Sequence, residues 1–219
     1  MFEYVIGDTV CDIGCDHGKL GAELLLRDKV KDVYGIDISE ASLEKSKRLK
    51  DEMELKGLHL MVGDGFEPVL NINIDCGIIC GIGSNETIGI IKRSQDFAGK
   101  LKRLVLCPLK NTYTVRKYLF ENGFIIVDED MAFENGRFYN IFVCKGGEKG
   151  SFDDVDIYVG RKLIEKRHPL LMQWLNKRVN DIENSINAYD NGVKTKRFDK
   201  RDNLQKMYNV YIRGIELCK

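Results

Sequence analysis

Short apolar segments rich in Val, Ile and Tyr alternate with polar segments of helical length through the first two-thirds of this 219-residue chain. This alternation is typical of an α/β fold, in which helices separate the strands. Two of the segments, Cys76–Cys80 and Arg103–Cys107, are almost wholly apolar in the middle, as expected for parallel strands buried on both faces. We therefore expect an open, largely parallel sheet. The expected strands are Thr9–Ile13, Val33–Asp37, His59–Gly63, Cys76–Cys80, Arg103–Cys107, Phe124–Met131 and Phe138–Lys145.

The last two of these segments are separated by a turn with the sequence Glu134-Asn135-Gly136-Arg137. Asn-Gly tolerates the positive φ angles of a tight hairpin, so we expect the sheet to end in two antiparallel strands. Five parallel strands followed by a hairpin describe the Rossmann-like sheet of class I methyltransferases better than that of a dinucleotide-dependent dehydrogenase. The second half of a dehydrogenase sheet normally returns to strand-helix-strand units. The sequence therefore predicts an α/β fold with a seven-stranded sheet of this class.

The pattern changes after a glycine-rich linker at residues 146–151. Apolar residues then recur at intervals of three and four residues, which is the spacing of a coiled-coil seam. Asn191-Gly192 interrupts the first seam and a second one follows, so we expect an antiparallel helical hairpin. Two domains result, a cofactor-binding sheet domain at residues 1–150 and a basic coiled-coil hairpin at residues 151–219. The seams comprise Leu171, Leu175, Val179, Ile182, Ile186 and Tyr189, and then Leu204, Tyr208, Tyr211 and Ile215.

Charge is distributed unevenly along the chain, although 34 Lys and Arg residues balance 34 Asp and Glu residues. Residues 161–219 carry 14 basic and 7 acidic side chains. Basic side chains neutralise phosphates and release counterions, so a positive tail suits an element that binds a polyanion. A solvated basic helix without a ligand is the alternative. The candidate RNA-binding residues are Lys194, Lys196, Arg197, Lys200 and Arg201.

Nothing at the N-terminus resembles a signal peptide, because Met1–Val10 has no basic region and no long apolar run. No later segment approaches the length of a membrane span. The seven cysteines form no metal-binding pair with two intervening residues, and we interpret them as reduced thiols of the core. We therefore expect a cytoplasmic monomer that contacts no membrane and holds no metal.

The segment Val10–Gly18 runs from a predicted strand through a glycine-punctuated turn into a helix. Ligands of open α/β sheets bind at such strand ends. Gly14 lets a cofactor approach the backbone closely, and Gly18 permits the turn or close helix packing. Either Asp12 or Asp16 can receive the ammonium group of a methionine moiety. A pyrophosphate fingerprint requires glycine where Asp16 stands, which disfavours NAD. Glycines at a strand end also serve loop geometry alone.

Two further strand ends carry carboxylates. Asp37 ends the segment Val33–Asp37, at the position expected to accept hydrogen bonds from both hydroxyls of a ribose. Asp64, between two glycines, can accept from the amino group of an adenine. Three strand ends in register indicate S-adenosylmethionine, and a Rossmann-like protein without an adenosyl ligand is the alternative. The candidate cofactor-binding residues are Asp12, Gly14, Cys15, Asp16, Gly18, Asp37, Ile38, Gly63, Asp64, Gly65 and Gly81.

These motifs resemble those of the TrmK-type bacterial tRNA adenine-N1 methyltransferases, a class I family, and the resemblance extends over nearly the whole chain. It implies S-adenosylmethionine as cofactor and N1 of adenine 22 in tRNA as acceptor. It also implies a Rossmann-like domain followed by a C-terminal coiled-coil hairpin. The segments that carry the resemblance are Asp12–His17, Gly63–Gly65, Cys80–Gly83, Leu106–Pro108, Arg116–Leu119, Asn122–Phe124 and His168–Leu171, with Trp174.

The chain departs from the family pattern on the substrate side. Lys19 and Leu109 replace a tyrosine and an asparagine, and Ser84 stands where the glycine loop usually has a second adjacent glycine. Ser84 and Asn85 are nevertheless our candidates for a pocket that receives the base. His17, beside the cofactor turn, either orients a neighbouring group or has a purely structural role. The resemblance thus supports the methyl donor more strongly than the acceptor.

Methylation of adenine N1 requires alignment more than a strong base, because the neutral ring has an in-plane lone pair at N1. The sequence therefore need not contain a catalytic triad or a carboxylate pair. Three functions remain open, and a tRNA methyltransferase comes first among them. A small-molecule methyltransferase of the same fold is the second, although the basic tail argues against it. A non-catalytic tRNA-binding protein that retains the cofactor pocket is the third.

Overall fold

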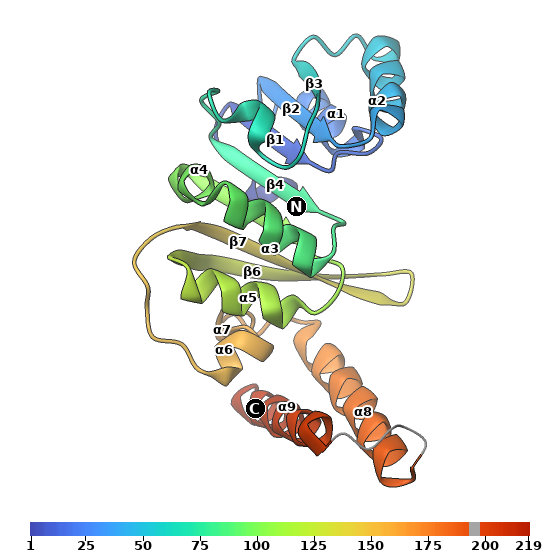
Figure 1. Cartoon of the computed structure of the whole chain (residues 1–219), viewed down its shortest axis with the longest axis vertical. Coiled ribbons are helices and arrows are strands. Elements are labelled where there is room, and N and C mark those ends of the chain that lie inside the picture. Colours follow the sequence, from blue (N-terminus) through green and yellow to red (C-terminus); the bar gives the residue numbers. More distant parts are fainter. Residues whose placement is uncertain (193–197) are drawn as a thin grey trace. The chain divides into compact units, whose positions relative to one another are not determined.

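The computed structural model describes residues 1–192 and 198–219 and divides into two compact units (Figure 1). The first unit comprises Met1–Asp128 and Asn140–Gly150, and the second comprises Glu129–Tyr139 and Ser151–Lys219. The second unit therefore includes residues 129–139, which the sequence-based boundaries place in the first domain. The reason is that Met131 and Phe138 pack in the apolar core of the C-terminal helices.

A single seven-stranded sheet has the strand order β3-β2-β1-β4-β5-β7-β6. Strands β1 to β5 are parallel, and β7 runs antiparallel to β5. This arrangement confirms the predicted Rossmann-like methyltransferase sheet. The strands are β1 (Thr9–Ile13), β2 (Asp32–Asp37), β3 (Leu58–Val62), β4 (Cys76–Cys80), β5 (Arg103–Cys107), β6 (Phe124–Glu134) and β7 (Arg137–Gly146).

The terminal hairpin is longer than predicted. Strands β6 and β7 extend to a turn in which only Asn135 and Gly136 lie outside the strands. Both residues have positive φ angles, of 50° and 76°, which is the geometry that suits a two-residue hairpin turn. Because the turn has only two residues, β6 and β7 extend up to it on both sides.

Helices cover both faces of the sheet in the first unit. Gly21 lies in helix α1, and a Cβ at this position would stand 2.8 Å from Val33 Cγ1 of β2. Ile36, three residues further along β2, points to the opposite face and packs with Ile91 and Val115 in the main core. The helices of this unit are α1 (Lys19–Leu26), α2 (Glu40–Glu52), α3 (Ser84–Arg93), α4 (Gln95–Lys100) and α5 (Thr112–Glu121), with short 3-10 turns at Phe2–Tyr4 and Glu67–Val69.

The second unit is helical, apart from the tip of the hairpin. The contacts between its two longest helices include Trp174 with Tyr211, Glu183 with Tyr208, and Asp190 with Arg201. The residue number rises along one helix as it falls along the other, so the two helices are antiparallel. A coiled-coil supercoil stays a prediction. The helices are α6 (Asp154–Tyr158), α7 (Arg161–Glu165), α8 (Leu171–Asp190) and α9 (Phe198–Leu217).

His168 fixes the start of α8 to the hairpin tip within the second unit. Its Nε2 atom lies 2.7 Å from Oδ1 of Asp130, and its Nδ1 atom accepts a hydrogen bond from the backbone nitrogen of Leu170. The side chain of His168 is 9% exposed, so these contacts are shielded from water. This residue of the His168–Leu171 motif therefore has a structural role.

The basic residues expected to bind RNA are only partly described. Lys194, Lys196 and Arg197 lie outside the described residues. Lys200 is exposed, whereas Arg201 forms a two-fold hydrogen-bonded ion pair with the carboxylate of Asp190 at 2.7 and 3.0 Å. The guanidinium of Arg201 thus joins α9 to α8, and its contact with RNA stays a prediction. No helix in the described part of the chain is long and apolar enough to span a bilayer.

Candidate functional site

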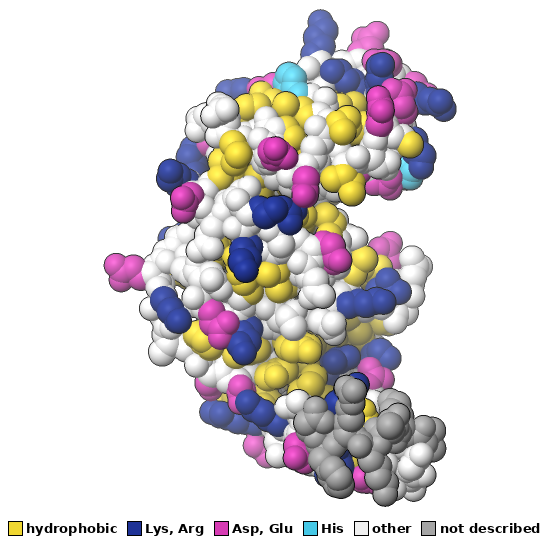
Figure 2. Space-filling model, viewed as in Figure 1, with side chains coloured by type: hydrophobic (Ala, Val, Ile, Leu, Met, Phe, Trp, Pro, Cys, Tyr) yellow, Lys and Arg dark blue, Asp and Glu magenta, His cyan; other side chains and the backbone are white. Residues whose placement is uncertain are grey.

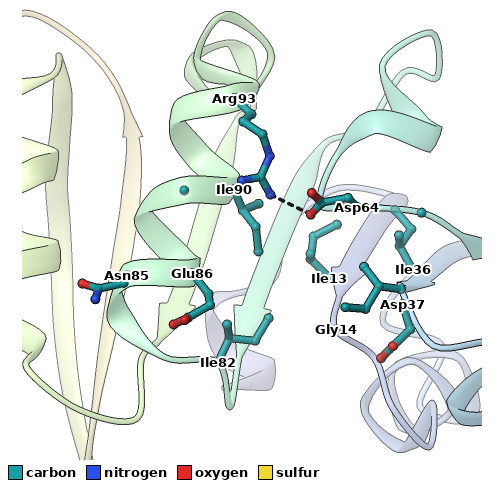
Figure 3. Close-up of a pocket in the computed structure, with 14 residues that line it drawn as sticks. Ile13, Gly14, Ile36, Asp37, Asp64, Ile82, Asn85, Glu86, Ile90 and Arg93 are labelled. Atoms are coloured by element: carbon teal, nitrogen blue, oxygen red, sulfur yellow. Dashed lines mark hydrogen bonds and ion pairs between the residues drawn. The ribbon is translucent and has the colours of Figure 1, made fainter.

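A cavity of about 550 Å³ lies at the carboxyl ends of the parallel strands (Figure 3). Hydrogen bonds between successive strand ends bring its walls together: the nitrogen of Gly14 donates to the carbonyl of Ile36, and that of Gly63 to the carbonyl of Asp37. In Figure 2, hydrophobic side chains are interspersed with acidic ones over the region of β1 to β3. The cavity is lined by Ile13, Gly14, Ile36, Asp37, Ile38, Gly63, Asp64, Gly65, Ile82, Asn85, Glu86, Gly89, Ile90 and Arg93.

Backbone donors hold the Asp37 carboxylate in place at the end of β2. Its Oδ2 atom accepts from the backbone nitrogen of Asp16 at 3.1 Å, and its Oδ1 atom accepts from that of Ser39 at 2.8 Å. Ser39 also caps α2, because its side chain accepts from the backbone nitrogen of Ser42. Each carboxylate oxygen can accept a second hydrogen bond. The group can therefore receive two neighbouring hydroxyls while it remains fixed.

The two glycines of the first turn have distinct structural reasons. Gly14 has a φ angle of 71°, and a Cβ on it would lie 2.7 Å from Ile82 Cδ1. Gly18 has a φ angle of 67°, and a Cβ there would stand 3.0 Å from Oγ of Ser46 in α2. Gly14 lines the cavity whereas Gly18 does not. Gly18 thus serves the turn and the helix packing, and Gly14 brings bare backbone to the cavity.

The other residues of the first turn lie outside the cavity lining. Asp12 is 4% exposed, and burial, together with the nearby charge of Asp37, raises its pKa to about 7. Burial also raises the pKa of the Cys15 thiol, to about 12. Asp16 and His17 point to each other, with 3.4 Å between Oδ2 and Nε2. The Asp12 carboxylate is therefore buried in β1 and is not part of the surface that the cavity presents to a ligand.

The glycine loop after β3 forms another side of the cavity. Gly65 has a φ angle of 62°, and a Cβ on it would lie 2.9 Å from Ile90 Cγ2 of α3. The neighbouring Asp64 carboxylate forms an ion pair with Arg93, with 2.6 Å between Oδ1 and Nη2. The loop after β3 therefore contributes the Asp64 carboxylate to the cavity lining, and Arg93 of α3 binds this carboxylate.

Ser84 has a structural role rather than the predicted contact with a base. It is 5% exposed, and its hydroxyl donates to the backbone carbonyl of Lys110. Gly81 and Leu109 add backbone hydrogen bonds to Cys107 and to Ile82, so the loops after β4 and β5 are joined. Gly81 does not line the cavity either, although no atom lies within 4 Å of the place of its missing Cβ. Burial beneath the joined loops removes Ser84 from the cavity surface.

Asn85 lines the cavity, and its predicted contact with a base stays a prediction. It begins a polar stripe on α3 that was not among the predicted site residues. In Figure 3 the Asn85 side chain points away from Asp37, and Glu86 lies near Ile82. Glu86 and Arg93 also line the cavity. Their spacing of seven residues places them on one helix face, which is the signal that could have identified them.

No group of three or more His, Cys, Asp or Glu residues in the described part of the chain is placed to hold a metal ion. All seven cysteines are free thiols, and burial raises the pKa of Cys11, Cys15, Cys76, Cys80 and Cys107. The polar groups available to a ligand in this cavity are therefore carboxylates, an amide, a guanidinium and backbone, which suit an organic ligand with hydroxyl and amino groups.

Comparison with known proteins identifies the family. Residues 2–142 match the methyltransferase domain family. The protein MG248 of Mycoplasma genitalium is 34% identical over 139 residues, which are 62% of this chain and 61% of that protein. The chain thus matches about three-fifths of the length of this relative. The tRNA (adenine(22)-N(1))-methyltransferase of Bacillus subtilis is 25% identical over 97% of this chain and 90% of its own length.

Solved structures show the same fold over nearly the whole chain. The structure of the B. subtilis m1A22 tRNA methyltransferase TrmK has a TM-score of 0.86 with 21% identity, and covers 100% of this chain and 95% of its own. The M. capricolum TrmK structure, in complex with S-adenosylhomocysteine, has a TM-score of 0.83 with 21% identity, and covers 97% and 92%. These findings confirm the TrmK-type resemblance seen in the sequence. The chain belongs to the methyltransferase domain family.

Proposed function

We propose that this protein is an S-adenosylmethionine-dependent methyltransferase that acts on tRNA, at N1 of adenine 22. The observation that carries the proposal is that Gly14, Asp37 and Asp64, which follow or end three neighbouring strands, line a single cavity. Membership of the methyltransferase family and the likeness to the B. subtilis enzyme, by its name an adenine-22 N1-methyltransferase, support it. On this proposal tRNA is the partner and the cytoplasm is the compartment.

The cavity residues fit an adenosyl ligand. The fixed carboxylate of Asp37 would accept from the two ribose hydroxyls, and Asp64 would accept from the adenine amino group. Ile36, Ile82 and Ile90 supply apolar walls for the flat ring and the thioether chain. The open backbone at Gly14 would admit the methionine end. A cavity of about 550 Å³ falls within the range of typical small-molecule sites.

The cofactor, when bound, supplies an electrophilic methyl group on a sulfonium. The lone pair of adenine N1 forms the new bond to the methyl carbon, while the electrons of the carbon–sulfur bond remain on sulfur. The products are 1-methyladenine, which carries the positive charge, and S-adenosylhomocysteine, and no proton leaves N1. The protein therefore contributes by aligning the base and by receiving it out of the RNA stack.

Asn85 is the residue that we assign to the base. It follows β4 at the start of α3, and its amide offers both a donor and an acceptor to the edge of a base. Leu109 and Lys110 lie on the adjoining loop, where Ser84 holds the backbone of Lys110. Lys110 is exposed and can contact a phosphate beside the target base. The departures from the family pattern at Ser84 and Leu109 thus fall on one joined pair of loops.

A methyl-transfer assay tests the proposal. The full chain is incubated with methyl-labelled S-adenosylmethionine and unmodified tRNA, and the RNA is digested for nucleoside mass spectrometry. The expected product is 1-methyladenine, and tRNA with guanine in place of adenine 22 should remain unlabelled. Another methylated nucleoside would contradict the adenine assignment but keep the enzyme class. Binding of cofactor and tRNA without turnover would favour a non-catalytic protein, and failure to bind tRNA would favour a small-molecule acceptor.

A further inference from the structure

An ion pair crosses the wall of the cavity between the loop after β3 and helix α3. Nη2 of Arg93 lies 2.6 Å from Oδ1 of Asp64, and each side chain is 54% exposed. Figure 3 shows the Arg93 side chain extending from the end of α3 to the Asp64 carboxylate. Both residues line the cavity. The pair is therefore part of the ligand-binding surface.

The surroundings of Arg93 leave room for its extended position. A Cβ on Gly89, one helical turn earlier, would lie 3.2 Å from Nη1 of Arg93. Ile90 packs against the glycine loop that carries Asp64. Helix α3 thus places a bare backbone position under the guanidinium and an apolar side chain beside the loop. A half-exposed ion pair contributes little to folding, so stability alone gives no reason for this arrangement.

We propose that Arg93 is a positioning residue that determines the specificity of the cavity for a 6-aminopurine. The inference rests on the proposed function, because the purine belongs to S-adenosylmethionine and its product. Arg93 occupies one oxygen of Asp64 and thereby restricts the rotation of the carboxylate. The remaining lone pairs of Asp64 are then held in fixed directions at the cavity wall. An ionised carboxylate has no donor, so these lone pairs can only accept hydrogen bonds.

This arrangement distinguishes an amino group from an oxo group at position 6 of the ring. The amino group of adenine donates to the held carboxylate. The oxo group of hypoxanthine is itself an acceptor and is repelled by the same oxygen. Without Arg93 the carboxylate of Asp64 can turn towards solvent. The preference for adenine should then decrease even though Asp64 is present.

Calorimetry on the full-length protein tests the inference, with S-adenosylhomocysteine and S-inosylhomocysteine as the two ligands. We expect Arg93→Ala to weaken binding of S-adenosylhomocysteine by about fivefold to tenfold. Its affinity for S-inosylhomocysteine should change less, so the ratio of the two dissociation constants should fall. Arg93→Lys retains a charge but not the planar fork, and it should restore part of the preference. Thermal unfolding of each variant should remain close to that of the wild type.

Lys92→Ala is the matched control. Lys92 is exposed in the same last turn of α3 and does not line the cavity, so its loss should leave both affinities unchanged. The inference would be overturned if Arg93→Ala left the ratio of the two dissociation constants unchanged. This holds if both ligands bind as they do to the wild type, and also if both bind more weakly by the same factor. In that case the wild type still binds S-adenosylhomocysteine and the proposed function stands. If the wild type does not bind S-adenosylhomocysteine at all, the proposed function fails and this inference fails with it.

Discussion

The backbone nitrogen of Asp16 donates a hydrogen bond to Oδ2 of Asp37 across 3.1 Å. This contact joins the glycine turn after β1 to the carboxyl end of β2. It therefore fixes the position of the turn relative to the Asp37 carboxylate, and a ligand can contact both. The contact uses the backbone nitrogen of Asp16 and not its carboxylate, so any residue except proline could supply it at this position. The side chain of Asp16 faces His17, while its nitrogen positions the group that is expected to bind ribose.

We expect Asp37→Ala to reduce the affinity for S-adenosylmethionine strongly. Two hydrogen bonds to a charged acceptor would be removed, at about 1.5–3 kcal/mol each. Even one such bond corresponds to roughly tenfold or more in the dissociation constant. Isothermal titration calorimetry with S-adenosylhomocysteine measures the effect, and circular dichroism checks the fold. Wild-type affinity in a folded Asp37→Ala protein would remove Asp37 from the site.

Asp12 should make stability depend on pH. Its pKa in the folded chain is about 7, against 3.8 for an ordinary aspartate, because burial and the charge of Asp37 favour the protonated form. The contribution of the protonated Asp12 to the free energy of unfolding is therefore complete below about pH 4. It is lost as the pH rises to about 7, and the loss is at most about 4 kcal/mol. Urea unfolding at several pH values should show this decline. Asp12→Asn should flatten the decline, and an equal slope in the variant would assign it to other groups.

Asn85→Ala should lower turnover more than cofactor affinity. The amide lies on the acceptor side, and misalignment of the base costs about tenfold to a hundredfold in rate. Steady-state kinetics with tRNA, together with calorimetry for S-adenosylhomocysteine, separate the two quantities. Ser84→Ala is the contrasting variant: it removes the hydrogen bond to Lys110 and should act by loosening the two loops. Equal losses of turnover and cofactor affinity in Asn85→Ala would contradict a role at the base.

The basic segment between α8 and α9 should determine part of the salt dependence of RNA binding. Replacing Lys194, Lys196 and Arg197 together should lower the slope of log affinity against log salt by about 0.7–0.9 for each phosphate that the variant no longer neutralises. Filter binding or fluorescence anisotropy at several salt concentrations measures the slope. Arg201→Ala is the control, because Arg201 already pairs with Asp190. A wild-type slope in the triple variant would mean that the cluster is only solvated. Deleting residues 161–219 is a poorer test, because Met131 of the hairpin packs with these helices.

Much of the fold could be predicted because its signals are local. The bounds of β1, β4 and β5 coincide with the predicted segments, since each is a short, mostly apolar run that follows a charged residue and precedes glycine or proline. The seam from Leu171 to Tyr189 falls within α8, because the spacing of its apolar residues is also a local signal. Helices α6 and α7 have five residues each, too few to show a helical period. They were therefore absent from the expected elements.

The candidate site divides in a similar way. The chain alone places Gly14, Asp37 and Asp64 at strand ends, and the parallel sheet brings these strand ends to one edge, so they line one cavity. Whether a side chain faces that cavity depends on its packing. Asp12 and Ser84 also lie in the motifs that follow or end the strands, but they do not face the cavity. Asp12 is buried in β1, and Ser84 is buried beneath two joined loops.

The sequence by itself determined the class of sheet, the position of each glycine turn and the carboxylates that follow the strands. These features depend on hydrophobic period and backbone conformation, which are properties of short segments. Only the tertiary structure decided that Arg93 meets Asp64, 29 residues away, and that residues 129–139 belong with the C-terminal helices. Such partners come together through packing between distant segments. No local sequence pattern predicts such partners, because segments with the same hydrophobic period can pack against different parts of a chain.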